Sequence, residues 1–311
     1  MFVAPRDSWW RLVLRYRGTE LPRTKYRILG VGAVSVVVTF LWKRYGLHPN
    51  LTPLPYTLIA VALGIFLGFR NNASYDRWWE GRKLWGALVN TTRTMARQAL
   101  TLITPRGEEP TEEVRALQRE IVYRTIAFVH ALRIALRRRG DVSELAPFLP
   151  DDEIARLREE KNVPYAISQG TAERLRRAWD KGWVEPIHLA TLDATLTGLT
   201  DIQGGCERIK TTSIPFSSTT LMHRIVAVYC YTLPFGVVDV VEIYTPFVVI
   251  LVSYAFFGLD VVGDELEDPF GDDVSDLPLN AISRTIEVNL RQRLGETDLP
   301  PLLEPVDNIL D

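Results

Sequence analysis

The chain has 311 residues and a formal net charge of −2, and 47% of its residues are hydrophobic while 24% are charged. A charge so near zero points to no nucleic acid as partner, and two cysteines in so long a chain exclude a disulfide framework. Hydrophobic residues concentrate in 28–69 and 214–262, and most charged residues lie between and after these ranges. The sequence therefore predicts an all-α integral membrane protein with a large polar midsection.

The first predicted element is a short amphipathic helix at the membrane surface. Residues 8–16 mix Trp and Tyr with Arg, a composition typical of the membrane interface. The apolar run 28–42 follows, and it reaches the length of a bilayer span when it is extended to Arg23 or Lys43. Residues 45–50 then predict a turn, so the chain returns as a helical hairpin.

The second apolar helix, 54–70, carries two stripes side by side. One is a face without polar atoms, on which residues recur every fourth position: Val61, Ile65 and Phe69. The other consists of small residues that let helices approach closely in a membrane: Ala60, Gly64 and Gly68. Around a symmetry axis the small stripe would close a ring and the apolar stripe would line a narrow channel. The alternative is an ordinary membrane helix whose large residues face lipid.

Basic residues predict the orientation of the hairpin. Those at its two ends are Arg6, Arg11, Arg15, Arg17, Arg23, Lys25 and Arg27 before the first helix, and Arg70, Arg77, Arg82 and Lys83 after the second. The intervening loop holds only Lys43 and Arg44. Because loops rich in Lys and Arg remain on the cytoplasmic side, both ends of the hairpin are expected there.

Residues 75 to about 210 have the pattern of water-soluble helices. Thr111, followed by two glutamates, predicts a helix start, and the run from Arg137 to Gly140 predicts the end of that helix. Further helices are expected over 171–183 and 187–202.

The second apolar block, 214–262, predicts two more membrane spans, at 215–233 and 244–262. The expected break lies at Pro234 to Gly236 together with the polar Asp239 and Glu242. The chain then has four membrane helices, with a large helical insertion between the second and the third, and both chain ends are cytoplasmic. Arg224 falls inside the third span, where it is either a functional charge or an interfacial Arg that pairs with a carboxylate.

The stretch 260–276 is acidic and contains no Lys or Arg. Clustered carboxylates beside a Gly turn suit a hard cation such as calcium, although the spacing departs from an EF-hand loop. The alternative, which we favour, is that these carboxylates pair with the many Arg side chains of the cytoplasmic domain.

Several motifs resemble the bestrophin family, in its bacterial branch. In chain order they are Tyr16-Arg17-Gly18, the block from Arg70 to Gly86, Glu185-Pro186-Ile187, Gly204 to Lys210, Ser213-Ile214-Pro215, and Glu267-Asp268-Pro269-Phe270-Gly271. The resemblance covers almost the whole chain. It implies a homopentameric ion channel around a central pore, in the inner membrane of a bacterial cell and surrounded by lipid.

The resemblance also implies site residues. The narrow neck of the pore falls on Val61, Ile65 and Phe69, and the constriction at the cytoplasmic exit falls on Ile187. The calcium clasp of animal members falls on Glu265, Asp268, Asp273 and Asp276, but acids stand here where that pattern has amides at its first two positions. The permeant species is a small monovalent ion, either chloride as in animal members or a cation as described for bacterial relatives.

The resulting divisions are 1–74 with the pore-lining helix, 75–212 as a cytoplasmic helical domain, 213–262 as the last two spans, and 263–311 as an acidic segment and tail. No cofactor is expected to be required, with calcium as a possible ligand. Two other classes of protein stay open: a membrane-anchored enzyme, for which no nucleophile or phosphate-loop motif is evident, and a membrane scaffold. Ion flux from sealed vesicles separates a scaffold from a channel.

Overall fold

The structure, a computed structural model, describes residues 1–3, 9–16, 18–46, 48–49, 51–107 and 109–311. Five residues used in the predictions above lie outside the described residues: Arg6, Ser8, Arg17, Leu47 and Asn50. The chain divides into an apolar unit of 4–79 and 213–269 and a polar unit of 1–3, 80–212 and 270–311. Within the described ranges the secondary structure is helical apart from two isolated β-bridges, so the predicted all-α fold is confirmed.

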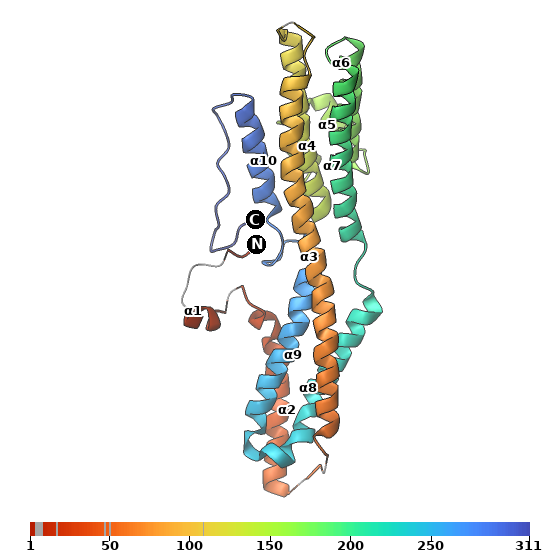
Figure 1. Cartoon of the computed structure of the whole chain (residues 1–311). Helices are drawn as coiled ribbons and strands as arrows, with labels where there is room; N and C mark the ends of the chain where they lie inside the picture. Colours follow the sequence, from red (N-terminus) through yellow and green to blue (C-terminus); the bar gives the residue numbers. More distant parts are fainter. Residues whose placement is uncertain (4–8, 17, 47, 50, 108) are drawn as a thin grey trace. The chain divides into compact units, whose positions relative to one another are not determined.

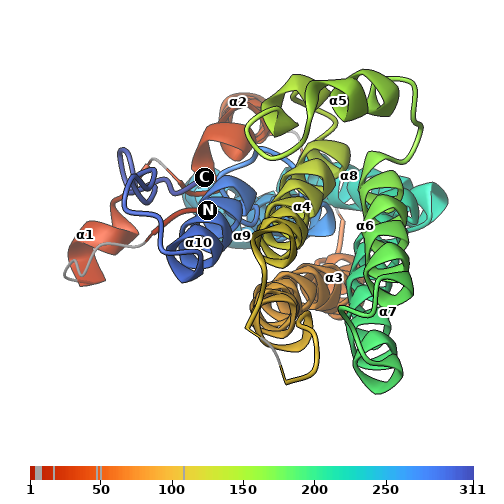
Figure 2. The ribbon, with the colours of Figure 1, turned by 90° about the horizontal axis from the view of Figure 1, so that it is seen from above.

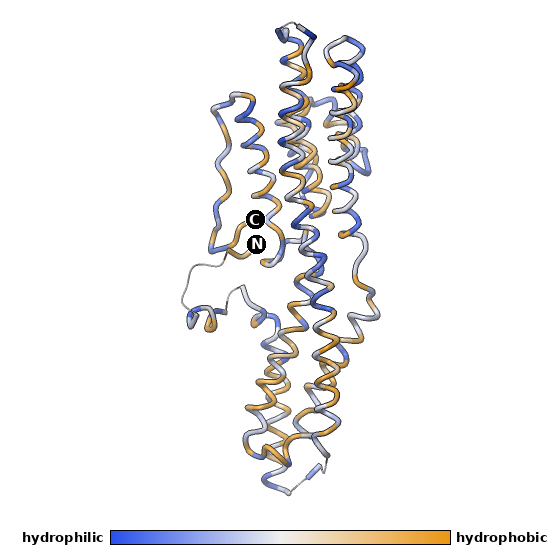
Figure 3. Tube along the Cα trace, viewed as in Figure 1, coloured by the Kyte–Doolittle hydropathy of each residue, from blue (hydrophilic) through white to orange (hydrophobic). Residues whose placement is uncertain are grey.

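The apolar unit contains the predicted membrane helices (Figure 1). Its elements are α1 (Trp9–Val13), α2 (Leu21–Tyr45), the first part of α3 (Leu54–Leu102), α8 (Phe216–Val241), η2 (Glu242–Tyr244) and α9 (Thr245–Glu267). Three continuous helical stretches are long and apolar enough to cross a membrane: Leu21–Tyr45, Leu54–Leu102 and Phe216–Glu267, the last of which contains both α8 and α9. Hydrophobic residues dominate the parts of these stretches that belong to the apolar unit (Figure 3).

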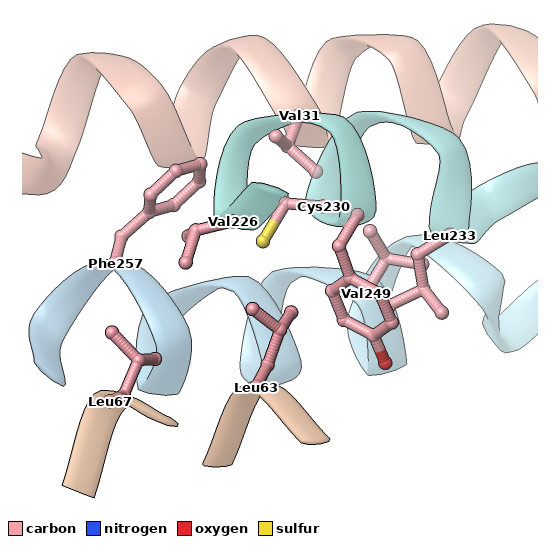
Figure 4. Close-up of a cluster of buried hydrophobic side chains, with 9 residues drawn as sticks. Val31, Leu63, Leu67, Val226, Cys230, Leu233, Val249 and Phe257 are labelled. Carbon is pink, nitrogen blue, oxygen red and sulfur yellow. The ribbon is translucent and has the colours of Figure 1, made fainter. Parts of the chain in front are cut away.

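One hydrophobic cluster holds the helices of the apolar unit together. It joins Val31 of α2, Leu63 and Leu67 of α3, Val226, Tyr229, Cys230 and Leu233 of α8, and Val249 and Phe257 of α9 (Figure 4). The Leu67 and Val249 side chains are fully buried. Because all four helices contribute to it, none packs independently of the others.

Helix α8 passes through the first part of the predicted break, Pro234 to Gly236, and ends just before the last residue of that break, Glu242. Pro234 lies inside the helix, which continues to Val241. A proline removes one backbone hydrogen bond, but neighbouring helices let a membrane helix tolerate it. The chain turns at Glu242, one of the polar residues of the predicted break, whose φ of 53° is left-handed and ends the helix.

The polar unit is a second group of helices. It holds the remainder of α3, α4 (Glu112–Arg137), η1 (Val142–Leu145), α5 (Asp151–Leu157), α6 (Val163–Asp180), α7 (Pro186–Thr211) and α10 (Leu279–Arg293). Helix α4 packs against α6 and α10, and α6 packs against α7 (Figure 2).

Local signals explain most of these helix boundaries. The Thr111 side chain accepts a hydrogen bond from the backbone N–H of Val114 at 3.4 Å, so the predicted cap of α4 is confirmed. Helix α6 begins at Val163 rather than near residue 171, because Asn162 caps it and Pro164 occupies its first turn. Proline is favoured there, because its missing N–H costs nothing in the first turn of a helix.

The core of the polar unit contains a buried ion pair. Arg124 of α4 donates two hydrogen bonds to Glu153 of α5, both at 2.7 Å, and a third to the Thr171 hydroxyl at 3.1 Å. Burial alone would raise the pKa of Glu153, but its pairs with Arg124 and Arg174 outweigh burial and lower it. This paired arrangement fixes α4, α5 and α6 to one another.

Candidate functional site

The three residues predicted for the neck lie on one exposed face of α3. Val61 is 60% exposed, Ile65 53% and Phe69 67%. Each lies one turn of helix beyond the last, and the described part of the chain covers none of the three. Sequence spacing had placed them together, and the structure shows that their own chain leaves this face open.

The opposite face of α3 is the one buried in its own unit. Leu63 and Leu67 enter the hydrophobic cluster, and the Ser74 side chain is completely buried. At Gly64 and Gly68, by contrast, an added Cβ atom would meet nothing within 4 Å. Inside a single chain, therefore, Gly64 and Gly68 have open space beside them, while Ala60 of the same stripe packs against the hydrophobic cluster.

The residue predicted for the second constriction, Ile187, lies in the polar unit. It is in the first turn of α7, directly after Pro186, and it is 70% exposed. Its backbone carbonyl accepts a hydrogen bond from the Thr191 hydroxyl at 2.9 Å. Nearby, Glu185 pairs with Arg106 at 3.5 Å.

A charged cluster in the apolar unit was not found from the sequence. Its centre is Asp260 of α9, whose side chain is only 1% exposed. One carboxylate oxygen accepts a hydrogen bond from Arg70 of α3 at 2.8 Å. The other lies 3.4 Å from Arg27 of α2 and 2.8 Å from Nδ1 of His223 in α8. Asp260 thereby links α9 to the three other helices of the unit.

The neighbouring carboxylate of Asp264 completes this cluster. It pairs with Arg70, and its oxygen lies 3.6 Å from Nε2 of His223. The donor atoms of His223, Asp260 and Asp264 lie within 4.8 Å of one another, which is close enough to hold a metal ion. However, Arg27 and Arg70 already neutralise the two carboxylates, so this geometry favours an ion-pair network over a cation site.

The sequence did contain a signal for this cluster. Arg70 comes directly after the apolar run that ends at Phe69, and Asp260 lies in the last turn of the predicted span 244–262. Residues that end two apolar spans at the same membrane face lie at similar depth and can pair. Arg70 had been used only to predict orientation, and Asp260 only as part of the acidic stretch.

Arg224 and the acidic stretch had been singled out from the sequence. The Arg224 side chain is exposed on α8, beside the clustered His223. Glu265 pairs with Arg23 at 3.2 Å, and Asp272 pairs with Arg139 at 2.6 Å, as expected if the carboxylates pair with Arg.

The four carboxylates predicted to bind calcium are divided between the two units. Glu265 and Asp268 belong to the apolar unit, and Asp273 and Asp276 belong to the polar unit. Asp276 is buried, and its carboxylate accepts a hydrogen bond from the backbone N–H of Asp273 at 2.7 Å. Calcium binding by the four together stays a prediction.

The cysteine of the polar unit has the properties of a structural thiol. Cys206 of α7 is fully buried, and burial raises the pKa of its thiol to about 12. The thiolate is the reactive form of cysteine, so this side chain is unreactive at neutral pH.

Comparison with known proteins identifies the family. Residues 1–292 match the model of the bacterial and fungal bestrophin proteins. A voltage-dependent anion channel-forming protein from Ralstonia nicotianae is 38% identical over 300 residues, which is 96% of each chain. The voltage-dependent anion channel-forming protein YneE from Escherichia coli strain K12 is 35% identical over 98% of each chain.

A solved structure agrees with these sequence relatives. The crystal structure of a bacterial bestrophin homolog from Klebsiella pneumoniae superposes with a TM-score of 0.81 at 34% identity, over 89% of this chain and 99% of that one. The match therefore extends to sequence, fold and length together. The chain belongs to the bacterial and fungal bestrophin family, whose members are membrane ion channels and not enzymes.

Proposed function

We propose that five copies of the chain form a channel for small monovalent ions, with Val61, Ile65 and Phe69 as its neck. The observation that carries this proposal is the exposed apolar stripe on α3, opposite the face that packs into its own unit. A stripe of this kind on a symmetry axis becomes a series of apolar rings, which an ion crosses only while they are wetted. The number of copies is the one that the family resemblance implies.

The small-residue stripe supports the same assembly. Gly64 and Gly68 have open space beside them within the chain, so a helix from a neighbouring copy can approach closely there. The side chain of Ile187, 70% exposed at the start of α7, would form a second apolar ring at the cytoplasmic exit. Both constrictions are then built from residues that a single chain leaves uncovered.

The membrane arrangement follows from the same helices. In this proposal α2, the first part of α3, α8 and α9 each span the bilayer, and both chain ends are in the cytoplasm. The excess of basic residues around the hairpin ends supports this orientation, and the inner membrane of a bacterium is the expected location. The protein requires no cofactor, and calcium at the acidic segment is an additional proposal.

A measurement of the reversal potential would determine whether the permeant ion is an anion or a cation. The relatives are named as anion channel-forming proteins, which favours an anion here. Apolar rings have no formal charge with which to select, so the preference comes from charged residues outside them or from the edges of aromatic rings such as Phe69, whose positive rim favours anions. Purified protein in planar bilayers, with unequal potassium chloride on the two sides, gives the sign directly. Absence of any current or vesicle flux would favour a scaffold.

Substitutions in the neck test where conduction is limited. We expect Ile65→Ala, Phe69→Ala and Ile187→Ala each to increase flux from sealed vesicles without changing the oligomer. Each change widens all five sides of a ring, and the wetting of an apolar constriction depends steeply on its radius.

Phe66→Ala is the matched control for the neck variants. Phe66 is 56% exposed on the same helix, but it points about 100° of helical rotation away from Ile65. Its truncation should leave the flux unchanged. Flux that responds to Phe66 but not to Ile65, Phe69 or Ile187 would show that another surface lines the pore.

A further inference from the structure

The exposed stripe of α3 continues beyond the predicted end of the pore helix. The sequence placed that end at residue 70, but α3 runs without a break from Leu54 to Leu102. Each residue of an α-helix advances by about 100°, so Asn72 and Asp76 lie within about 20° of the direction of Ile65. Both side chains are exposed. The neck and Asp76 also belong to the same compact unit, 4–79 with 213–269.

Asp76 is the first charged residue on this stripe after the neck. It follows Phe69 by seven residues, or about 10 Å along the helix. Among the described residues its carboxylate has no hydrogen bond and no ion pair. The adjacent cation is engaged elsewhere, since Nε of Arg77 donates to the backbone carbonyl of Glu267 at 3.1 Å. Asp76 therefore presents a carboxylate without an ion-pair partner among the described residues to any ion that passes the stripe.

We infer that Asp76 forms a ring of carboxylates at the end of the neck and shifts the channel's preference toward cations. The inference rests on the proposed function, because the ring exists only if the stripe faces a symmetry axis. Rings of Asp or Glu beside a narrow pore concentrate cations and repel anions. The apolar neck carries no formal charge, so this ring adds a charge-based contribution to selectivity that the neck does not have.

The size of the effect follows from screened electrostatics. For an ion passing about 10 Å from five unit charges, with a Debye length of about 8 Å at physiological salt, the local concentration changes about threefold. The local concentration of a cation rises by this factor, and that of an anion falls by the same factor. At 1 M salt the Debye length is about 3 Å, so the effect should almost disappear.

The test is the reversal potential of Asp76→Asn in planar bilayers under a potassium chloride gradient. Whatever sign the wild type prefers, we expect the potential to move toward the equilibrium potential of chloride. The ratio of potassium to chloride permeability should fall severalfold at physiological salt, and the change should vanish near 1 M. Asp76→Glu keeps the charge and should keep the wild-type ratio.

Asp180→Asn is the matched control. Asp180 is 51% exposed and pairs with Arg176 at 3.2 Å on α6, so its neutralisation removes the same charge from a position off the stripe. Its permeability ratio should equal that of the wild type.

Two outcomes overturn the inference while leaving the proposed function intact. One is an unchanged ratio in a conducting Asp76→Asn channel, and the other is an equal change in Asp180→Asn. A wild-type protein that passes no ions would instead contradict the proposed function itself.

Discussion

Within the described charged cluster, Asp260 is the residue that contacts side chains from the largest number of other helices. Its buried carboxylate contacts Arg70, Arg27 and His223, which come from three different helices. Arg70 is itself nearly buried, with a side chain 5% exposed, so it depends on Asp260 and Asp264 for neutralisation. Removing one partner of a buried pair leaves an uncompensated charge, which costs far more than the pair itself contributes.

We therefore expect Asp260→Asn to destabilise the protein by about 3–5 kcal/mol. The measurement is the melting temperature of the purified protein in detergent. Glu265→Gln, in calcium-free buffer, is the matched control, because Glu265 pairs with an Arg23 side chain that is 42% exposed. Partly exposed pairs of this kind contribute about 0–1 kcal/mol. Equal losses in the two variants would show that the cluster is no more important than a surface pair.

For single residues, the sequence predicts which side chains share a face of one helix better than it predicts which side chains form ion pairs between helices. The period of four on α3 made the neck face predictable from Val61, Ile65 and Phe69, because spacing along one helix fixes direction. The partner of Arg70 was not predictable in the same way. Asp260 lies 190 residues later, and several carboxylates near it were equally plausible partners.

At the scale of whole elements, α3 and α8 contact each other through a glycine. A Cβ added at Gly236 of α8 would overlap the aromatic ring of Tyr56 in α3. Tyr56 also packs beside Tyr229, with ring centroids 6.3 Å apart, so its ring has little freedom to move aside. Gly236 therefore sets how closely these two helices approach.

Gly236→Ala should lower the melting temperature, at a cost of about 1–3 kcal/mol for an overpacked contact. Combining it with Tyr56→Ala should remove most of this cost, as a double-mutant cycle would show. Gly204→Ala on α7 is the control, since a side chain there meets nothing within 4 Å. An additive double mutant would mean that the two residues do not limit the approach of the helices.

Helix boundaries show where local signals fail. Thr111 marked the start of α4 correctly, because a cap acts within a few residues. Pro234 misled, because packing by neighbouring helices compensates a proline that would end an isolated helix. The length of α3 also escaped prediction, since a change from apolar to polar sequence at Arg70 resembles a boundary although the backbone continues.

At the scale of the whole molecule, the open space beside Gly64 and Gly68 predicts assembly. We expect the wild type to have the mass of five copies in mild detergent. Gly64→Leu should reduce that mass while leaving the helix content unchanged, because a Cβ at this position has open space around it in its own chain. The readouts are native mass and circular dichroism. A wild type that is monomeric or dimeric in several detergents would contradict the pore.

The ion pair between Arg70 and Asp260 can form only late in the synthesis of the chain. The two residues are separated by 190 positions, so Arg70 leaves the ribosome well before its partner exists. At about 5–20 residues per second, the interval is about 10–40 s. During this interval the first helical hairpin has already been made, but Arg70 has no carboxylate of α9 with which to pair. A chain whose synthesis stops before Asp260 cannot form this ion pair, which distinguishes an unfinished chain from a complete one.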